Sequence, residues 1–74
     1  MCGIIGIASN KSVSENIINS LKKLEYRGYD SAGIATIHND FLNEKKCSGR
    51  VEVLEKILFN SPARGNIGIG HVRW

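Results

Sequence analysis

Residues 24–33 have the sequence Leu24-Glu25-Tyr26-Arg27-Gly28-Tyr29-Asp30-Ser31-Ala32-Gly33, and the organisation of the chain follows outward from this stretch. Apolar residues before it recur at helical spacing, and an apolar run that favours a strand follows from Ala32 to Ile37. Its polar residues therefore lie between a helix and a strand, where a rigid scaffold can direct them at a site. Considered alone, the stretch is most simply interpreted as a turn that contains a salt bridge.

Toward the N-terminus, the sequence predicts a strand and a helix. Residues 3–8, Gly-Ile-Ile-Gly-Ile-Ala, form a short apolar run typical of a buried strand. Ser12 and Glu15 have the spacing of a capping box, which predicts that a helix begins there. Gly28 is expected to end this segment. The helix spans about three turns, and its apolar stripe consists of Val13, Ile17, Ile18, Leu21 and Leu24.

Toward the C-terminus, the sequence predicts a hairpin, a second helix and a last strand. Residues 32–47 form the hairpin, with a turn at residues 38–40. Residues 60–66 are expected to form a loop, and residues 67–74 alternate as in a strand. The second helix is indicated by apolar residues at helical spacing, namely Val51, Leu54, Ile57 and Leu58.

Composition limits the chain to one small globular domain. Its 74 residues are 42% hydrophobic and 23% charged, which excludes a disordered chain. No apolar run reaches the roughly 18 to 20 residues of a membrane span. The net charge is +3, but the basic residues are scattered and do not interleave with aromatic residues as on a nucleic-acid platform. We therefore expect neither a nucleic acid nor a membrane as a partner.

The two cysteines, Cys2 and Cys47, do not form a CxxC motif or any Cys/His pattern with ligand spacing. We therefore expect no metal site and no cofactor. No secretory signal opens the chain, and the expected compartment is the cytoplasm, where thiols stay reduced.

Cys2 is a candidate nucleophile because it directly follows the initiator Met1. Removal of Met1 would leave a thiol and a free α-amine on one residue, and such an amine has a reference pKa of about 7.7–8.0. Nucleophile and general base would then belong to the same residue. From position alone, a small buried residue is the simpler interpretation of Cys2.

The last residues also combine useful chemistry. Arg73 can hold a carboxylate with two parallel hydrogen bonds, and Trp74 can form the wall of a pocket. Gly68 and Gly70 would permit a close approach to the backbone. Without further context, this segment is an ordinary end of a strand.

Taken together, three segments resemble one family in order and spacing: Cys2-Gly3-Ile4-Ile5-Gly6-Ile7, residues 24–33 and residues 68–74. They are similar to the start of the class II glutamine amidotransferase domain in the glutamine–fructose-6-phosphate aminotransferase family. Tyr29 and Asp30 point to this branch, because the related amidophosphoribosyltransferases usually have His-Arg-Gly-Gln there and asparagine synthetases have Arg-Gly-Pro-Asp. The resemblance implies an α+β fold, the four-layer α/β/β/α sandwich of N-terminal-nucleophile (Ntn) hydrolases, of which this chain supplies a portion.

The resemblance also implies a role for each matching residue. Cys2 would attack the side-chain amide carbon of L-glutamine, form a thioester and release ammonia, with its own α-amine as base and then acid. Arg27 would orient the nucleophile, and Gly28 would supply closely approaching backbone. Arg73 would bind the glutamine α-carboxylate, and Trp74 would begin a loop that closes over glutamine.

Two residues beside Arg73 need separate interpretation. We assign His71 a packing role. Val72 stands where the family usually has Thr in Gly-His-Thr-Arg-Trp. The lost hydroxyl would weaken glutamine binding if it faced the pocket, whereas Val would be a near-isosteric filler if it faced the core.

We interpret residues 1–74 as an N-terminal fragment of that amidotransferase domain. The oxyanion hole, an aspartate for the glutamine α-amine and the sugar-isomerase domains that bind fructose 6-phosphate would lie outside it. The implied parent, expected to be a homodimer, makes glucosamine 6-phosphate and glutamate from fructose 6-phosphate and glutamine, while this chain alone is expected to be inactive. Two alternatives remain open: another class II amidotransferase such as an amidophosphoribosyltransferase, or a truncated remnant without a catalytic role.

Overall fold

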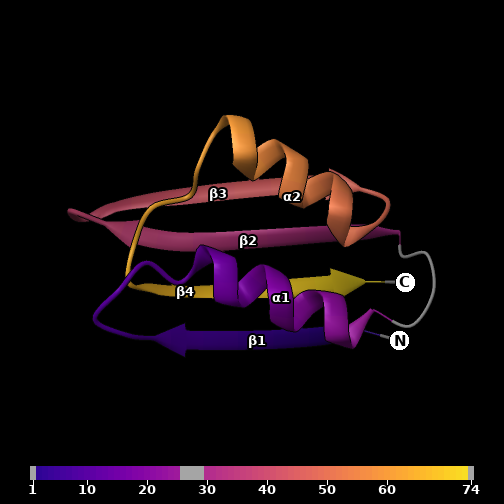
Figure 1. Ribbon diagram of the computed structural model, residues 1–74, viewed down its shortest axis with the longest axis horizontal. Helices are drawn as coiled ribbons and strands as arrows, with labels where there is room; N and C mark the ends of the chain where they lie inside the picture. Colours follow the sequence, from indigo (N-terminus) through magenta and orange to yellow (C-terminus); the bar gives the residue numbers. More distant parts are fainter. Residues whose placement is uncertain (1, 26–29, 74) are drawn as a thin grey trace.

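The computed structural model describes residues 2–25 and 30–73, which form one antiparallel four-stranded sheet and two helices (Figure 1). Both helices lie on the same side of the sheet, so the molecule has two layers. This arrangement confirms the α+β class. In chain order, the elements are β1 (Gly3–Ala8), α1 (Ser14–Leu24), β2 (Ser31–His38), β3 (Phe41–Ser48), α2 (Val51–Asn60) and β4 (Ile67–Arg73).

The strand order is β1-β4-β2-β3, so the last strand of the chain lies between the first and the second. Gly3 at the start of β1 pairs with Val72 near the end of β4, and Arg73 pairs with Ser31 at the start of β2. The start of β1, the end of β4 and the start of β2 therefore meet at one end of the sheet. Figure 1 shows both chain termini at this end.

The hydrophobic core lies between the sheet and the helices. Helix α1 packs on β1 and β4, and α2 packs on β2 and β3. Since side chains alternate along a strand, each strand presents every second residue to this core. The buried apolar side chains are Val13, Ile17, Ile18, Leu21, Ala32, Ile34, Val51, Leu54, Ala63 and Val72.

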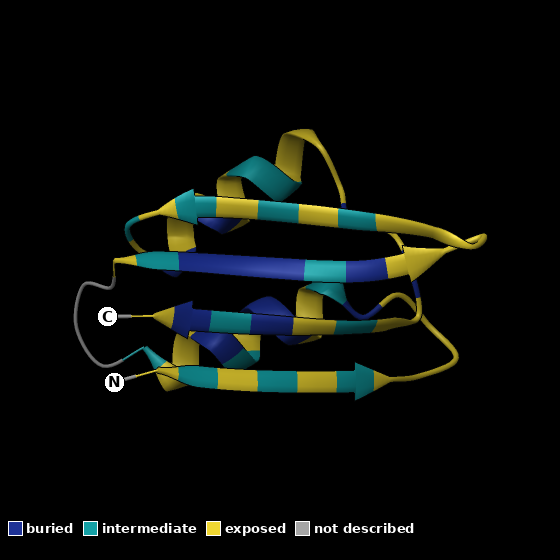
Figure 2. Cartoon of the chain, turned by 180° about the vertical axis from the view of Figure 1, so that it is seen from behind, coloured by how far each residue is buried: buried dark blue, intermediate teal, exposed yellow. Residues whose placement is uncertain are grey.

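The opposite face of the sheet carries no helix and remains open (Figure 2). Several of its side chains are nevertheless large and apolar: Ile4 is 76%, Leu42 is 68% and Ile69 is 56% exposed. Ile37 and Ile67 pair with each other on the same face and are also exposed. We call these five residues the open apolar face.

The predicted hairpin and second helix are confirmed. The hairpin turns at Asn39 and Asp40, whose φ angles are 52° and 67°. Two consecutive positive φ values are those of a type I′ turn, which Asn and Asp tolerate and which matches the twist of paired strands. Neither described helix is long and apolar enough to cross a membrane.

The predicted capping box at Ser12 and Glu15 is wrong. Helix α1 begins at Ser14, its N-cap is Val13, and no side chain caps it among the residues described there. Instead, the Val13 N–H donates to the Gly65 carbonyl at 3.0 Å, and the Val13 carbonyl accepts from the Ile17 N–H at 2.9 Å. Burial of Val13 and this tertiary hydrogen bond set the start of the helix, so local capping chemistry is overridden.

Candidate active site

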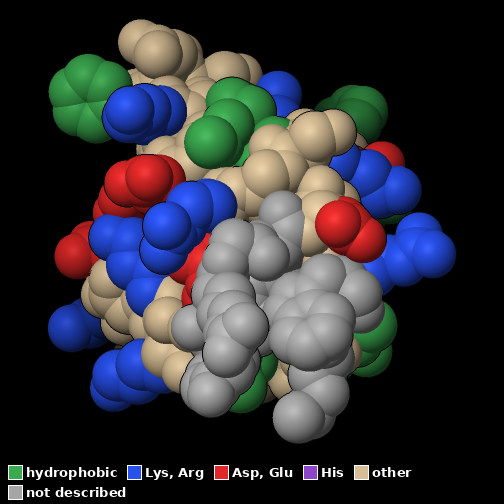
Figure 3. All heavy atoms as spheres, turned by 90° about the vertical axis from the view of Figure 1, so that its right-hand side faces the viewer, with side chains coloured by type: hydrophobic (Ala, Val, Ile, Leu, Met, Phe, Trp, Pro, Cys, Tyr) green, Lys and Arg blue, Asp and Glu red, His purple; other side chains and the backbone are tan. Residues whose placement is uncertain are grey.

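The fold brings Cys2 and Arg73 to the same end of the sheet from opposite ends of the chain. Cys2 directly precedes β1, whose first residue, Gly3, pairs with Val72, the neighbour of Arg73. Figure 3 shows this end of the molecule, with both basic and acidic described side chains near the edge of the view. The other predicted site residues, Arg27, Gly28 and Trp74, lie outside the described residues.

Arg73 and Cys2 are both exposed at this end. Val72 is buried beneath the helices, so alternation along β4 places the neighbouring Arg73 on the open face. Arg73 forms no ion pair with another described residue. An exposed thiol and an exposed guanidinium at one end of the sheet are chemically suited to a small substrate that carries a carboxylate.

His71 covers Gly33 on the open face. A Cβ added to Gly33 would lie 2.5 Å from the Nε2 atom of His71, so only glycine leaves room for the imidazole in this position. Gly33 is buried although it lies on the face without helices, as the dark middle of β2 in Figure 2 illustrates. This contact supports the packing role assigned to His71.

Val72 belongs to the core rather than to the site. Its side chain is 1% exposed, and Val72 pairs with Gly3 and Ala32 on the face covered by the helices. The core alternative of the two interpretations is therefore the one that the structure supports. A threonine hydroxyl here would point into the protein interior and away from the open face that carries Arg73.

Gly68 and Gly70 permit a close approach, but α1 and, at Gly68, β2 are the elements that approach. A Cβ on Gly70 would overlap the Cγ2 atom of Ile17, whereas a Cβ on Gly68 would lie 2.8 Å from Ala35 O and Thr36 Cγ2 in β2 and 3.1 Å from the Ile17 Cδ1 atom. Gly70 lets α1 sit directly on β4, Gly68 makes room for β2 as well, and the substrate-side explanation offered by the sequence is not needed.

Cys47 lies on the helix-covered face of β3, where it pairs with Ala32 and is half-buried. Burial raises the pKa of its thiol, and a hydrogen bond with the Ala32 backbone opposes this only in part. A raised pKa lowers the thiolate fraction and hence the nucleophilicity at neutral pH. Within the described part of the chain, no cluster of three or more His, Cys, Asp or Glu side chains can hold a metal ion.

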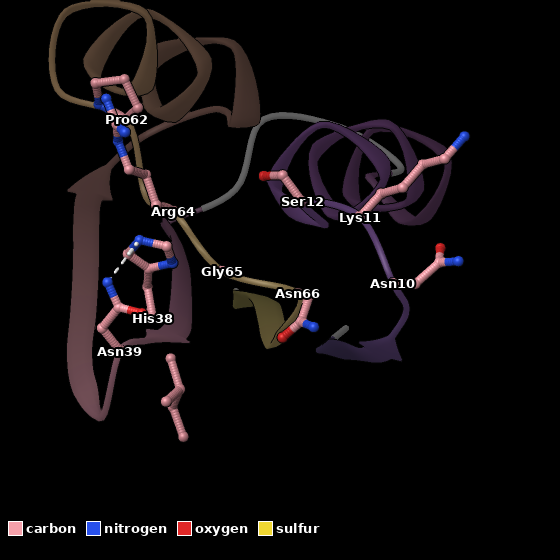
Figure 4. Close-up of a pocket in the computed structure, with 10 residues that line it drawn as sticks. Asn10, Lys11, Ser12, His38, Asn39, Pro62, Arg64, Gly65 and Asn66 are labelled. Carbon is pink, nitrogen blue, oxygen red and sulfur yellow. Dashed lines mark hydrogen bonds between the residues drawn. The ribbon is translucent and has the colours of Figure 1, made fainter.

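A cavity of about 660 Å³ lies at the opposite end of the sheet, beside the hairpin turn and residues 62–66 (Figure 4). It is open to solvent and lined mainly by polar side chains. Arg64 extends beside Pro62, whereas Lys11 extends from the other wall, so the two cations point away from each other. Because these groups do not converge, the cavity does not displace the Cys2 end as the candidate site.

Glu25 lies at the Cys2 end of the sheet and has a partner that the sequence did not predict. Its Oε2 atom accepts a hydrogen bond of 3.0 Å from the Val51 N–H at the start of α2. The two residues are 26 positions apart, so no local pattern could have paired them.

Comparison with known proteins gives a consistent result, although no family model matches the chain. A glutamine--fructose-6-phosphate aminotransferase (isomerizing) from Bartonella henselae is 53% identical over all 74 residues. Proteins with the same name from Brucella abortus and Clostridium acetobutylicum are 54% and 51% identical over the same length. The chain spans 12% of the length of each of these relatives.

Proposed function

Because the chain is homologous over its whole length to part of the glutamine--fructose-6-phosphate aminotransferases, we propose that it carries the nucleophile and the carboxylate-binding arginine of a glutaminase site. The full-length protein would use the ammonia released from L-glutamine to convert fructose 6-phosphate to glucosamine 6-phosphate. The observation that carries this proposal is the meeting of Cys2 and Arg73 at one end of the sheet, within a sequence about half identical to these enzymes.

The chemistry begins at Cys2 after removal of Met1. The α-amine accepts the thiol proton, and the sulfur attacks the side-chain amide carbon of glutamine to form a tetrahedral intermediate. The carbon–nitrogen bond then breaks, the α-ammonium returns the proton to the leaving nitrogen, and ammonia departs from a thioester. Water, deprotonated by the same amine, hydrolyses the thioester to glutamate and regenerates the thiol.

Arg73 binds the other end of the substrate. Its guanidinium matches the planar geometry of the α-carboxylate. Cys2 directly precedes the first residue of β1, and Arg73 directly follows the residue of β4 that pairs with it. Both side chains therefore start from one end of the sheet, where one substrate can engage both. We also propose that Arg27 and Gly28 orient the nucleophile and that Trp74 covers bound glutamine.

The open apolar face supports the proposed four-layer sandwich. Isolated apolar side chains are common on protein surfaces, but Ile4, Ile37, Leu42, Ile67 and Ile69 occupy one face of one sheet. A second sheet packs on such a face at about 10 Å. We propose that further residues of the full-length protein supply that sheet and the oxyanion hole. Domains for fructose 6-phosphate, a homodimeric state and a cytoplasmic location belong to the same proposal.

An assay on the full-length protein tests the function. We expect glutamate and glucosamine 6-phosphate to form, and we expect Cys2→Ala to abolish both products because the nucleophile is lost. Cys47→Ala is the matched control and should retain both activities, since Cys47 lies half-buried on the other face. Glutamate formation by the Cys2→Ala variant at the wild-type rate would refute the proposal.

A further inference from the structure

Glu25 links the end of α1 to the start of α2. Its backbone N–H donates to the Leu21 carbonyl at 2.9 Å, which closes α1. Its side chain, which is 10% exposed, accepts the hydrogen bond from the Val51 N–H at 3.0 Å. Backbone and side chain of Glu25 thus have fixed partners in two different helices.

The bond to Val51 provides what α2 lacks locally. The N-cap residue Arg50 has extended backbone angles and makes no side-chain capping bond of its own. A carboxylate oxygen on a first-turn N–H satisfies an otherwise unpaired donor and lies at the positive end of the helix dipole. Arg50 adds little, because its Nε atom is 3.9 Å from Glu25 Oε1 and its side chain is 58% exposed.

The turn that precedes α2 also binds Asp30, the residue that follows residues 26–29 in the sequence. The Gly49 N–H donates to the Asp30 carbonyl at 2.9 Å. Gly49 has a φ of +91°, a conformation that favours glycine. Glu25 and Asp30 flank residues 26–29, and both are bound to the Gly49–Val51 turn. This turn therefore holds Glu25 at the end of α1 and Asp30 directly before β2.

We propose that Glu25 is a positioning residue for the glutaminase site and that its bond to Val51 fixes the end of α1, from which the chain continues to Arg27 and Gly28. The inference rests on the proposed function of Cys2, Arg27 and Gly28. Glu25 contacts neither the thiol nor glutamine in this mechanism. It acts through the segment that it anchors, so its loss impairs attack by Cys2 more than binding of glutamine through Arg73.

Three variants of the full-length protein test this role. Glu25→Ala removes the acceptor, Glu25→Gln keeps an acceptor without the charge, and Glu55→Ala is the matched control. Glu55 also joins the two helices, through an ion pair of 2.8 Å with Lys22, but its side chain is 48% exposed.

In the glutaminase assay, we expect Glu25→Ala to lower kcat at least tenfold while KM for glutamine changes less than about threefold, because misplacement of reacting groups mainly affects chemistry. Glu25→Gln should recover most of the wild-type kcat, and Glu55→Ala should match the wild type. The proposal is overturned if Glu25→Ala keeps the wild-type kcat, if Glu25→Gln is as impaired as Glu25→Ala, or if Glu55→Ala is equally impaired.

Amide hydrogen exchange provides a readout that does not depend on catalysis. Glu25→Ala should accelerate exchange at Gly49 and Val51 while β4 exchanges as in the wild type, and Glu25→Gln should restore protection. Unchanged exchange in Glu25→Ala would refute the anchoring. If instead Cys2→Ala remained active while the exchange result held, the proposed function would fail and the anchor would stand.

Discussion

The four residues at the end of β4 face two different environments. Gly70 and Val72 point toward the helices, where a side chain on Gly70 would strike Ile17 and Val72 is almost fully buried. His71 and Arg73 point to the face without helices, where one covers Gly33 and the other is exposed. Adjacent positions of one strand are therefore constrained by different requirements: packing under the helices on one face and, for Arg73 on the other face, the glutamine binding that we propose. Substitutions on the helix-covered face should therefore change mainly stability, whereas substitution of Arg73 should change mainly the kinetics with glutamine.

The largest effect is expected at Arg73. Arg73→Ala removes the proposed partner of the glutamine α-carboxylate, and we expect kcat/KM for glutamine to fall about 100-fold or more, since loss of one partner of a close charged pair costs about 2–5 kcal/mol. The melting temperature should change little because the side chain is exposed. Steady-state kinetics and thermal unfolding of the full-length protein measure the two quantities. A large stability loss with normal kinetics would mean that Arg73 serves the fold.

The next effect is expected at Gly70 and has the opposite character. Gly70→Val places a branched side chain against Ile17 and Leu21, and overpacking of this kind costs about 1–3 kcal/mol of unfolding free energy. Urea denaturation should show the loss. Gly6→Val is a suitable control because a Cβ there comes no closer than 3.8 Å to any atom. Equal losses for both variants would contradict the close packing of α1 on β4.

A smaller effect is expected at Val72. Val72→Thr introduces the residue that the family resemblance leads us to expect here, but it places a hydroxyl in the core, so the unfolding free energy should fall by about 1–3 kcal/mol unless the hydroxyl finds a partner. KM for glutamine should stay at its wild-type value. A markedly lower KM in Val72→Thr would show that this position contributes to the substrate pocket after all.

The smallest effect concerns pH and Cys47. Burial raises the pKa of the folded thiol above its ordinary value of 9.0, so the unfolded state gives up this proton at lower pH than the folded state. The contribution of the protonated Cys47 thiol to the unfolding free energy is therefore fully present below the ordinary thiol pKa, and it is lost as pH rises through the folded pKa. Between pH 8 and 10, wild-type protein should therefore lose slightly more unfolding free energy than Cys47→Ala. Identical pH profiles would show that Cys47 titrates as an exposed thiol.

The sequence predicted the helices and strands of this fold better than their arrangement in space. Alternation in residues 67–74 and the turn at residues 38–40 were sufficient to predict the last strand and the hairpin, because those signals are local. The position of β4 between β1 and β2 depends on long-range pairing and had no local signal. For the same reason, the orientation of Val72 stayed open until register placed it under the helices.

The candidate site shows the same division. Cys2 and Arg73 were identified by residue type and family resemblance, whereas their meeting at one end of the sheet follows from the pairing of β1 with β4. The capping box at Ser12 failed because Val13 bonds to Gly65, which is distant in sequence. Glu25 had no local signal for its partner because the Val51 N–H comes from another helix.

The central claim is that Cys2 is an activated nucleophile in a glutamine site, and selective labelling tests it most directly. The full-length protein is treated at neutral pH with a glutamine analogue that carries an electrophilic ketone, and the modified peptides are identified by mass spectrometry. We predict modification of Cys2 at one equivalent per chain, protection by excess glutamine, and no modification of Cys47. Equal labelling of the two cysteines, or labelling of Cys2 that glutamine does not slow, would contradict the account.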